Sequence, residues 1–230
     1  MNAAQVGDSL TRSVEDYLKT IYRLTPAGRP AATSEIAQAL DLSPASVSGM
    51  IKRLSEQRLL DHAPYRGAQL TEEGRRVALR MIRRHRLIES YLVAALGYSW
   101  DTVHDEAERL EHAVSDTLVE RMAAAMGHPT SDPHGDPIPG ADGSMIEEDV
   151  VPLSELPAGP EFAIRRVRAE DPELLRHLAD RGLRPGVMVT IVERQPFNGP
   201  ITIRLAEVDQ VIGAEVAHHL LCAVANEGPS

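Results

Sequence analysis

The hydrophobic period of the sequence changes near residue 150, and this change constrains the fold more than any other feature. Up to residue 126, apolar residues recur every three or four positions, which predicts amphipathic helices. The later apolar runs are short and rich in β-formers: FAIRRV (162–167), VMVTIV (187–192) and ITIRL (201–205). Between the two regions, residues 128–149 are rich in Pro, Gly and Asp and are interpreted as a linker. We therefore expect helical domains followed by a small β-barrel domain with one inserted helix, residues 172–182.

Composition excludes several classes of protein. The chain has 230 residues, of which 43% are hydrophobic and 25% charged, and these values are ordinary for a folded globular protein. No apolar run approaches the roughly 20 residues that span a bilayer, and the N-terminus lacks the basic-then-apolar order of a signal peptide. Cys222 is the only cysteine, so an internal disulfide and a Cys-based zinc site are excluded. The expected location is cytoplasmic.

The first 71 residues have the order of a winged helix-turn-helix. Helices are expected over residues 9–24, 33–40 and 44–60, with Thr33 or Ser34 as the N-cap of the second. A three-residue turn precedes the third helix, where Ser43 suits the N-cap and Pro44 the first position. A stretch punctuated by Pro and Gly then predicts a β-hairpin over 61–71.

The third of these helices is the one expected to read DNA. In this motif it fits the major groove, and its exposed N-terminal side chains meet base edges. Those side chains are small here, so DNA shape and thymine methyl groups should matter, while basic side chains reach phosphates. The predicted DNA contacts are Ser43, Ala45, Ser46, Ser48, Gly49, Lys52, Arg53 and, at the hairpin tip, Arg66. The alternative is an ordinary three-helix core with a solvated face.

Charge is distributed unevenly along the chain. The net charge of −10, taken alone, argues against nucleic acid. Residues 1–90, however, hold 14 Lys and Arg against 10 Asp and Glu, whereas residues 91–150 hold 2 against 13. A basic head suits phosphates and an acidic middle suits cations.

Two long helices, expected over residues 72–96 and 100–126, carry His and Glu at helical spacing. In the second, an arc of about 100° beside the apolar stripe contains His104, Glu108, Glu111 and His112. The first offers His85, which falls within its apolar stripe, and Glu89 four residues later. Carboxylates and imidazoles without thiolates suit Mn²⁺, Fe²⁺ or another divalent first-row ion. The alternatives are a satisfied core histidine and a solvated acidic face.

Together these motifs resemble the diphtheria-toxin-repressor family of metal-dependent transcriptional regulators, and within it the manganese transport regulators. The matching stretches are DYLKTIYRL (16–24), the helix-turn-helix (33–60), YRGAQLTEEGRR (65–76), RRHRLIESYL (83–92), VHDEAERLEHAVSD (103–116) and DPHGDPIPG (132–140). The C-terminal part resembles the SH3-like domain of the longer members.

The resemblance implies a mainly α protein with a small β domain. The implied parts are a winged helix-turn-helix DNA-binding domain (1–71), a helical metal-binding and dimerisation domain (72–140), a linker (141–149) and an SH3-like, FeoA-like β-barrel (150–226). Family members are homodimers that bind palindromic operators when metal is present.

The resemblance also implies two metal sites. The primary ligands would be Asp16, Glu108, Glu111 and His112, and the ancillary ligands His85, Glu89 and His104, with Glu170 and Glu173 from the third domain. Iron-selective members have Met and Cys where this chain has Asp16 and Glu108, and hard carboxylates shift the preference toward Mn²⁺. Lys19 stands where some manganese regulators have a further Glu, which disfavours a bridged two-metal cluster.

The sequence thus predicts a Mn²⁺-activated dimeric repressor of manganese-uptake genes, with operator DNA as partner and with no enzymatic activity, membrane or organic substrate. An Fe²⁺-dependent repressor is the nearest alternative, with Co²⁺, Ni²⁺, Zn²⁺ or Cd²⁺ as substitutes in vitro. A metallohydrolase using His85, Glu89, His104 and Glu111 would leave the helix-turn-helix unexplained, and no nucleophile constellation or Gly-rich phosphate loop supports it. A metal-independent regulator that binds a small organic ligand is the last alternative.

Overall fold

The chain forms two compact units in the computed structural model, which describes residues 10–25, 29–63, 67–146, 148–169 and 171–224. The first unit comprises residues 1–85 and 139–144, and the second comprises residues 86–138 and 145–230. The long helix α4 (Glu72–Leu96) contributes to both. No helix among the described residues is long and apolar enough to cross a membrane.

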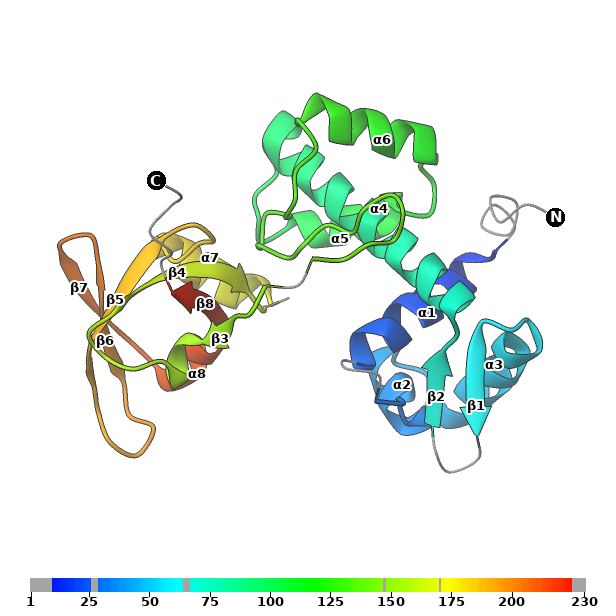
Figure 1. Ribbon diagram of the computed structural model, residues 1–230, viewed down its shortest axis with the longest axis horizontal. Coiled ribbons are helices and arrows are strands. Elements are labelled where there is room, and N and C mark those ends of the chain that lie inside the picture. The colour runs from blue at the N-terminus through cyan, green and yellow to red at the C-terminus, as the bar shows by residue number, and fades with distance from the viewer. Residues whose placement is uncertain (1–9, 26–28, 64–66, 147, 170, 225–230) are drawn as a thin grey trace. The chain divides into compact units, whose positions relative to one another are not determined.

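The first unit contains the predicted winged helix-turn-helix (Figure 1). Its elements are α1 (Arg12–Leu24), α2 (Thr33–Ala39), α3 (Pro44–Glu56), β1 (Leu60–Ala63) and β2 (Gly67–Leu70). The two strands pair antiparallel, from Leu60 opposite Leu70 to Ala63 opposite Gly67. Gly67 has a φ of +88°, and a Cβ there would lie 2.6 Å from the Ala31 carbonyl oxygen, so the close approach requires glycine.

The predicted apolar faces of these helices form the core of the first unit. Val47, Ile51 and Leu54 of α3 are buried, and they pack with Leu18 and Ile21 of α1. The Ser43 side chain caps α3 by accepting a hydrogen bond from the Ser46 amide. The predicted cap of α2 is wrong. Its N-cap is Ala32, because the Glu35 carboxylate of the first turn accepts the Ala32 amide at 2.7 Å.

α4 spans the predicted range, and Gly97 ends it with a φ of +71°. The single helix predicted over 100–126 is wrong, because the chain forms α5 (Val103–Leu110) and α6 (Asp116–Ala125). Ser115 interrupts the helix. Its backbone is extended and its side chain accepts the Leu118 amide as an N-cap. His112 consequently lies in the turn between the two helices.

The interpretation of residues 128–149 as a linker is wrong for the part before residue 139. Asp132 and His134 are buried, and the Ile138 amide donates to the Thr130 carbonyl at 2.8 Å. The Arg86 guanidinium donates to the Pro137 carbonyl, and its Nε lies 3.6 Å from Asp132 Oδ2. This stretch is an ordered loop whose polar groups are hydrogen-bonded or ion-paired. Composition alone does not distinguish such a loop from a linker, because both are rich in Pro and Gly.

The C-terminal domain is a six-stranded antiparallel sheet in the order β3-β8-β4-β5-β6-β7. Its strands are β3 (Val151–Pro152), β4 (Glu161–Val167), β5 (Met188–Arg194), β6 (Ile201–Leu205), β7 (Val208–Ile212) and β8 (Leu220–Val224). A short 3₁₀ turn, η4 (Leu153–Glu155), and two helices, α7 (Pro172–Asp180) and α8 (Ala214–His218), accompany them. β4, β5, β6 and α7 match predicted elements, whereas the sequence does not predict β3, β7 and β8, which carry no clear alternation.

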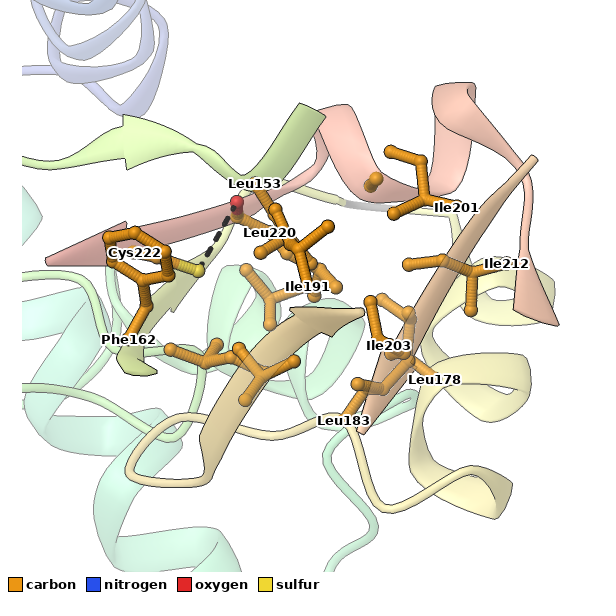
Figure 2. Close-up of a cluster of buried hydrophobic side chains, with 14 of the residues drawn as sticks. Leu153, Phe162, Leu178, Leu183, Ile191, Ile201, Ile203, Ile212, Leu220 and Cys222 are labelled. Atoms are coloured by element: carbon orange, nitrogen blue, oxygen red, sulfur yellow. Dashed lines mark hydrogen bonds between the residues drawn. The ribbon is translucent and has the colours of Figure 1, made fainter. Parts of the chain in front are cut away.

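Figure 2 shows the apolar centre of this domain, with side chains from η4, the strands and α7 directed toward one another. Cys222 belongs to this core, and its Sγ lies 3.8 Å from the Leu220 carbonyl oxygen. Burial raises the pKa of its thiol to about 12. The only cysteine is therefore a core residue and not a reactive one.

Candidate metal centre

A buried carboxylate, Glu111, stands at the C-terminal end of helix α5. Val103 and Ala107 of α5 pack against Ile88 and Leu92 of α4. Glu111 continues this buried face, because its amide still donates to the Ala107 carbonyl at 2.9 Å, and its side chain is 0% exposed. An ionised carboxylate in such a place needs compensating positive charge.

Two further side chains that can bind a metal, a carboxylate and an imidazole, lie close to Glu111. One ligand atom from each of Glu108, Glu111 and His112 lies within 4.8 Å of the others. His112 Nε2 is 3.3 Å from Glu111 Oε1. Two carboxylates and an imidazole form a hard, mainly oxygen donor set, which suits Mn²⁺, Fe²⁺ and similar ions better than soft metals.

His104 links α5 to α4. Its Nδ1 lies 3.1 Å from Oε1 of the buried Glu89, and its Nε2 lies 3.9 Å from Glu108 Oε1. The imidazole thus stands between two carboxylates that the resemblance assigns to different sites. His85 is buried one helical turn before Glu89 on α4.

A third group combines α4 with the loop after α6. Glu89, Asp132 and His134 are all buried, and one ligand atom from each lies within 4.8 Å of the others. His134 Nε2 is 2.8 Å from the Trp100 carbonyl oxygen. Since a carbonyl only accepts, Nε2 carries a proton, so Nδ1 is the nitrogen whose lone pair could bind a metal.

The electrostatics of this group favour a cation. Burial, followed by the charges of Asp136 and Glu89, raises the pKa of Asp132 to about 8, although Arg86 acts in the opposite direction. Asp132 also accepts hydrogen bonds from the amides of His134 and Asp136, at 2.8 and 3.0 Å. A divalent ion would displace the proton from Asp132 and satisfy the carboxylate.

The sequence does not predict Asp132 and His134 as ligands, because the composition around them indicates a linker. The available signal is the stretch DPHGDPIPG, which places an Asp and a His two residues apart. Its meaning depends on the long-range approach to Glu89, which spacing along the chain does not reveal.

The remaining predicted ligands belong to other elements of the chain. Asp16 is half-buried on α1 in the first unit, where its carboxylate is 3.9 Å from Arg12 Nε. Glu173 is exposed in the first turn of α7, and its amide donates to Asp171 Oδ1. Glu170 lies outside the described residues. Ligation by these side chains, as by the other predicted ligands, stays a prediction.

The DNA-reading face predicted for α3 is exposed. Burial of Val47, Ile51 and Leu54 on the opposite side turns outward the cap and the small and basic residues, Ser43, Ala45, Ser46, Ser48, Gly49, Lys52 and Arg53. The Ser48 hydroxyl donates to the Pro44 carbonyl at 2.8 Å, so its oxygen remains an acceptor for a base. Arg66 lies outside the described residues.

An exposed recognition helix together with buried carboxylate–imidazole groups defines a class: a DNA-binding regulator that uses a divalent metal. Family comparisons agree with this class. Three family profiles match: "Iron dependent repressor, N-terminal DNA binding domain" over residues 9–68, "Iron dependent repressor, metal binding and dimerisation domain" over 71–140, and the FeoA domain over 151–224.

Full-length relatives and solved structures extend the match to the whole chain. The iron-dependent repressor IdeR of Mycobacterium tuberculosis is 34% identical over 223 residues, which are 92% of this chain and 96% of that protein. The diphtheria toxin repressor of Corynebacterium diphtheriae is 32% identical, with 91% and 96% covered. A manganese-dependent transcriptional repressor in complex with manganese is 38% identical with a TM-score of 0.85, and 92% of this chain and 99% of that chain are covered. ScaR with bound Cd²⁺ is 31% identical, with a TM-score of 0.77 and the same coverage.

The chain belongs to the diphtheria toxin repressor family of metal-dependent transcriptional repressors. Its helical DNA-binding and dimerisation domains and its C-terminal FeoA-type, SH3-like domain confirm the predicted fold class. Members of this family are repressors and not enzymes, so the metallohydrolase alternative is excluded.

Proposed function

We propose that the protein is a Mn²⁺-activated homodimeric repressor that binds palindromic operator DNA and controls manganese-uptake genes. The observation that carries the proposal is the fully buried Glu111 with Glu108 and His112 beside it. This donor set contains no sulfur, and oxygen ligands of this kind suit Mn²⁺. The names of its relatives point to both metals, because IdeR is iron-dependent and the structure with the TM-score of 0.85 is manganese-dependent.

Asp16 is proposed as the fourth ligand of the primary site. It lies on the first helix of the DNA-binding domain, whereas Glu108, Glu111 and His112 lie on or just after α5. Ligation by all four would tie the DNA-binding domain to α5. A bound ion would also relieve the repulsion among three carboxylates, so the orientation of the recognition helix would depend on metal.

The ancillary site is proposed to use His85, Glu89 and His104, with Glu170 and Glu173 from the C-terminal domain. The 3.1 Å approach of His104 to Glu89 supports the first part of this set. The buried group of Glu89, Asp132 and His134 is a further candidate that shares Glu89, so a cation held by Glu89 has two alternative sets of partners.

Iron(II) remains the second candidate activator. Divalent affinity generally rises from Mn²⁺ through Fe²⁺ and Co²⁺, so tightness alone does not select Mn²⁺. Selection would have to come from geometry and from the metal that the cell supplies.

A gel-shift titration with the protein's own promoter tests the function. Mn²⁺, Fe²⁺, Co²⁺, Ni²⁺, Zn²⁺ and Cd²⁺ are each added to chelated protein, and binding is measured as a function of free ion. The proposal requires a retarded dimer complex that appears with Mn²⁺ in the range found in cells. Equal binding after complete chelation would exclude a metal switch, and activation by Fe²⁺ alone would replace manganese with iron.

A further inference from the structure

Trp100 fills the core of a domain to which it does not belong in sequence. It lies in the segment between α4 and α5, yet it is 3% exposed and belongs to the apolar cluster of the C-terminal sheet, which also includes Leu153, Phe162 and Val167. Burial of an indole removes a large apolar surface from water and therefore stabilises the contact between this segment and the C-terminal domain.

Two electrostatic contacts also hold Trp100 and its neighbour against the C-terminal domain. The Arg184 guanidinium carbon lies 5.0 Å from the centroid of the Trp100 ring, in cation–π geometry. The neighbouring Asp101 carboxylate is 3.7 Å from Arg176 of α7. The indole, a cation over its face and an adjacent ion pair therefore hold the C-terminal domain against residues 100–101.

The same tryptophan holds His134. The two rings stack with centroids 5.5 Å apart and an interplanar angle of 18°. The Trp100 carbonyl accepts the hydrogen bond that fixes the imidazole tautomer. From the other side, the Val167 amide of β4 donates to the His134 carbonyl at 2.8 Å. His134 is thus fixed by the helical segment and by the C-terminal sheet together.

The backbone of the loop that carries His134 packs directly against the backbone of β4. Gly135 has a φ of +85°, and a Cβ at this position would lie 1.9 Å from the Arg165 carbonyl oxygen. Asp136 next to it is 3.2 Å from the Arg166 side chain. The contacts that dock the C-terminal domain are therefore also the contacts that fix the position of His134.

We propose that Trp100 is a positioning residue that couples docking of the C-terminal domain to cation binding by Glu89, Asp132 and His134. The proposal rests on the proposed metal-dependent function, because it requires a divalent ion at this group. Trp100 presents His134 Nδ1 to the ion, and a bound ion in turn holds the loop on which the C-terminal domain rests. Such coupling is reciprocal: docking raises the affinity for metal, and metal strengthens docking by the same factor.

The first test uses Trp100 as a probe, because it is the only tryptophan in the chain. Its emission in the full-length metal-free protein should be that of a buried indole, poorly quenched by acrylamide. Mn²⁺ should change the emission, since the ring stacks on a proposed ligand. Asp132→Ala should remove this change, whereas the control Asp105→Ala, on the exposed part of α5, should keep it.

The second test separates positioning from a merely structural role. Arg184→Met keeps the stem of an exposed side chain but removes the cation over Trp100, and Arg204→Met on β6 is the matched control, because Arg204 pairs with Asp209. We expect Trp100→Leu to weaken Mn²⁺ binding at this group about tenfold, as loss of a residue that orients a ligand does. Trp100→Phe should restore part of it and Arg184→Met should fall between. The readouts are calorimetric Mn²⁺ titration and protease protection of the C-terminal domain with and without Mn²⁺.

Unchanged Mn²⁺ affinity in Trp100→Leu and Arg184→Met, with folded protein by circular dichroism, would overturn the proposal. The proposal would also be overturned if the Trp100 emission did not change with Mn²⁺ while calorimetry showed the ion bound. Operator binding is measured in parallel. If it proves independent of metal while the emission and protection still respond, the proposed function fails and the coupling stands.

Discussion

The polar residues of the predicted DNA-reading helix and those of the candidate metal centre differ in burial. The small and basic residues on α3 are all exposed, whereas Glu89, Glu111 and Asp132 of the second unit are 2%, 0% and 8% exposed. An exposed polar face costs little when it has no partner, because water solvates it. A buried carboxylate has no such option, so it must be neutralised by a proton or by a cation.

This difference assigns the two regions different roles. The α3 face is ready for a partner that comes from outside, and phosphate-rich DNA matches its Lys52 and Arg53. The buried groups are proposed to respond to a small ion that enters the protein. A repressor controlled by metal needs both, with the buried group setting whether the exposed face is presented correctly.

The largest effect should follow removal of a buried ligand. Glu111→Ala or His112→Ala should reduce Mn²⁺-dependent operator affinity by more than about 100-fold, because each removes a direct ligand and even residues that orient ligands give 10- to 100-fold losses. Gel shifts at fixed free Mn²⁺ measure this. Asp105→Ala serves as the control for an acidic residue on the exposed face of α5, and a similar loss there would mean that overall charge and not ligation matters.

Exchange of hard for soft ligands should change the rank order of metals without abolishing the response. In the double variant Asp16→Met, Glu108→Cys, activation should shift from Mn²⁺ toward Fe²⁺ or Co²⁺, because sulfur ligands favour softer ions. Activation midpoints for each ion provide the measurement, and circular dichroism checks the fold. An unchanged midpoint and rank order would show that neither residue selects the metal.

On the exposed face, single substitutions should have smaller effects. Lys52→Ala and Arg53→Ala should each lower DNA affinity several-fold on all sequences. Each should also reduce the slope of log K against log salt by about 1, because one cation no longer neutralises a phosphate. Affinity is measured at several salt concentrations with Mn²⁺ saturating, and Arg204→Ala on β6 is the control. If the slope stays constant, these side chains do not bind phosphate.

The last prediction concerns folding stability and not DNA binding, through the protonation of Asp132. Its pKa is about 8 in the folded protein, so the folded state binds a proton more tightly than the unfolded state between about pH 4 and pH 8. The contribution to stability is therefore present at low pH and is lost as pH rises toward 8. Denaturant unfolding in chelator should show this decline, Asp132→Asn should lack it, and Mn²⁺ should bind more tightly as pH rises. A pH-independent difference between the two proteins would contradict the assignment.

Periodicity predicts the helices that end at a glycine or proline, and local spacing predicts the ligands that share one helix. α4 and the pair of His104 and Glu108 are examples, because neighbours three or four residues apart share a face. The break before α6 depends on the N-cap Ser115. The sequence does not reveal it, because the apolar stripe continues across this position. Asp132 and His134 could not be assigned because their partner, Glu89, is 43 and 45 residues away along the chain.

Whether the buried carboxylates control the exposed DNA-reading face is decided by operator affinity as a function of free Mn²⁺. The full-length protein is titrated by fluorescence anisotropy with its own promoter, beside Glu111→Ala under the same conditions. We expect a steep rise in affinity with Mn²⁺ for the wild-type protein, reversed by chelator, and weak metal-independent binding for the variant. Equal affinity of the two proteins at every Mn²⁺ concentration would show that the buried carboxylates exert no such control.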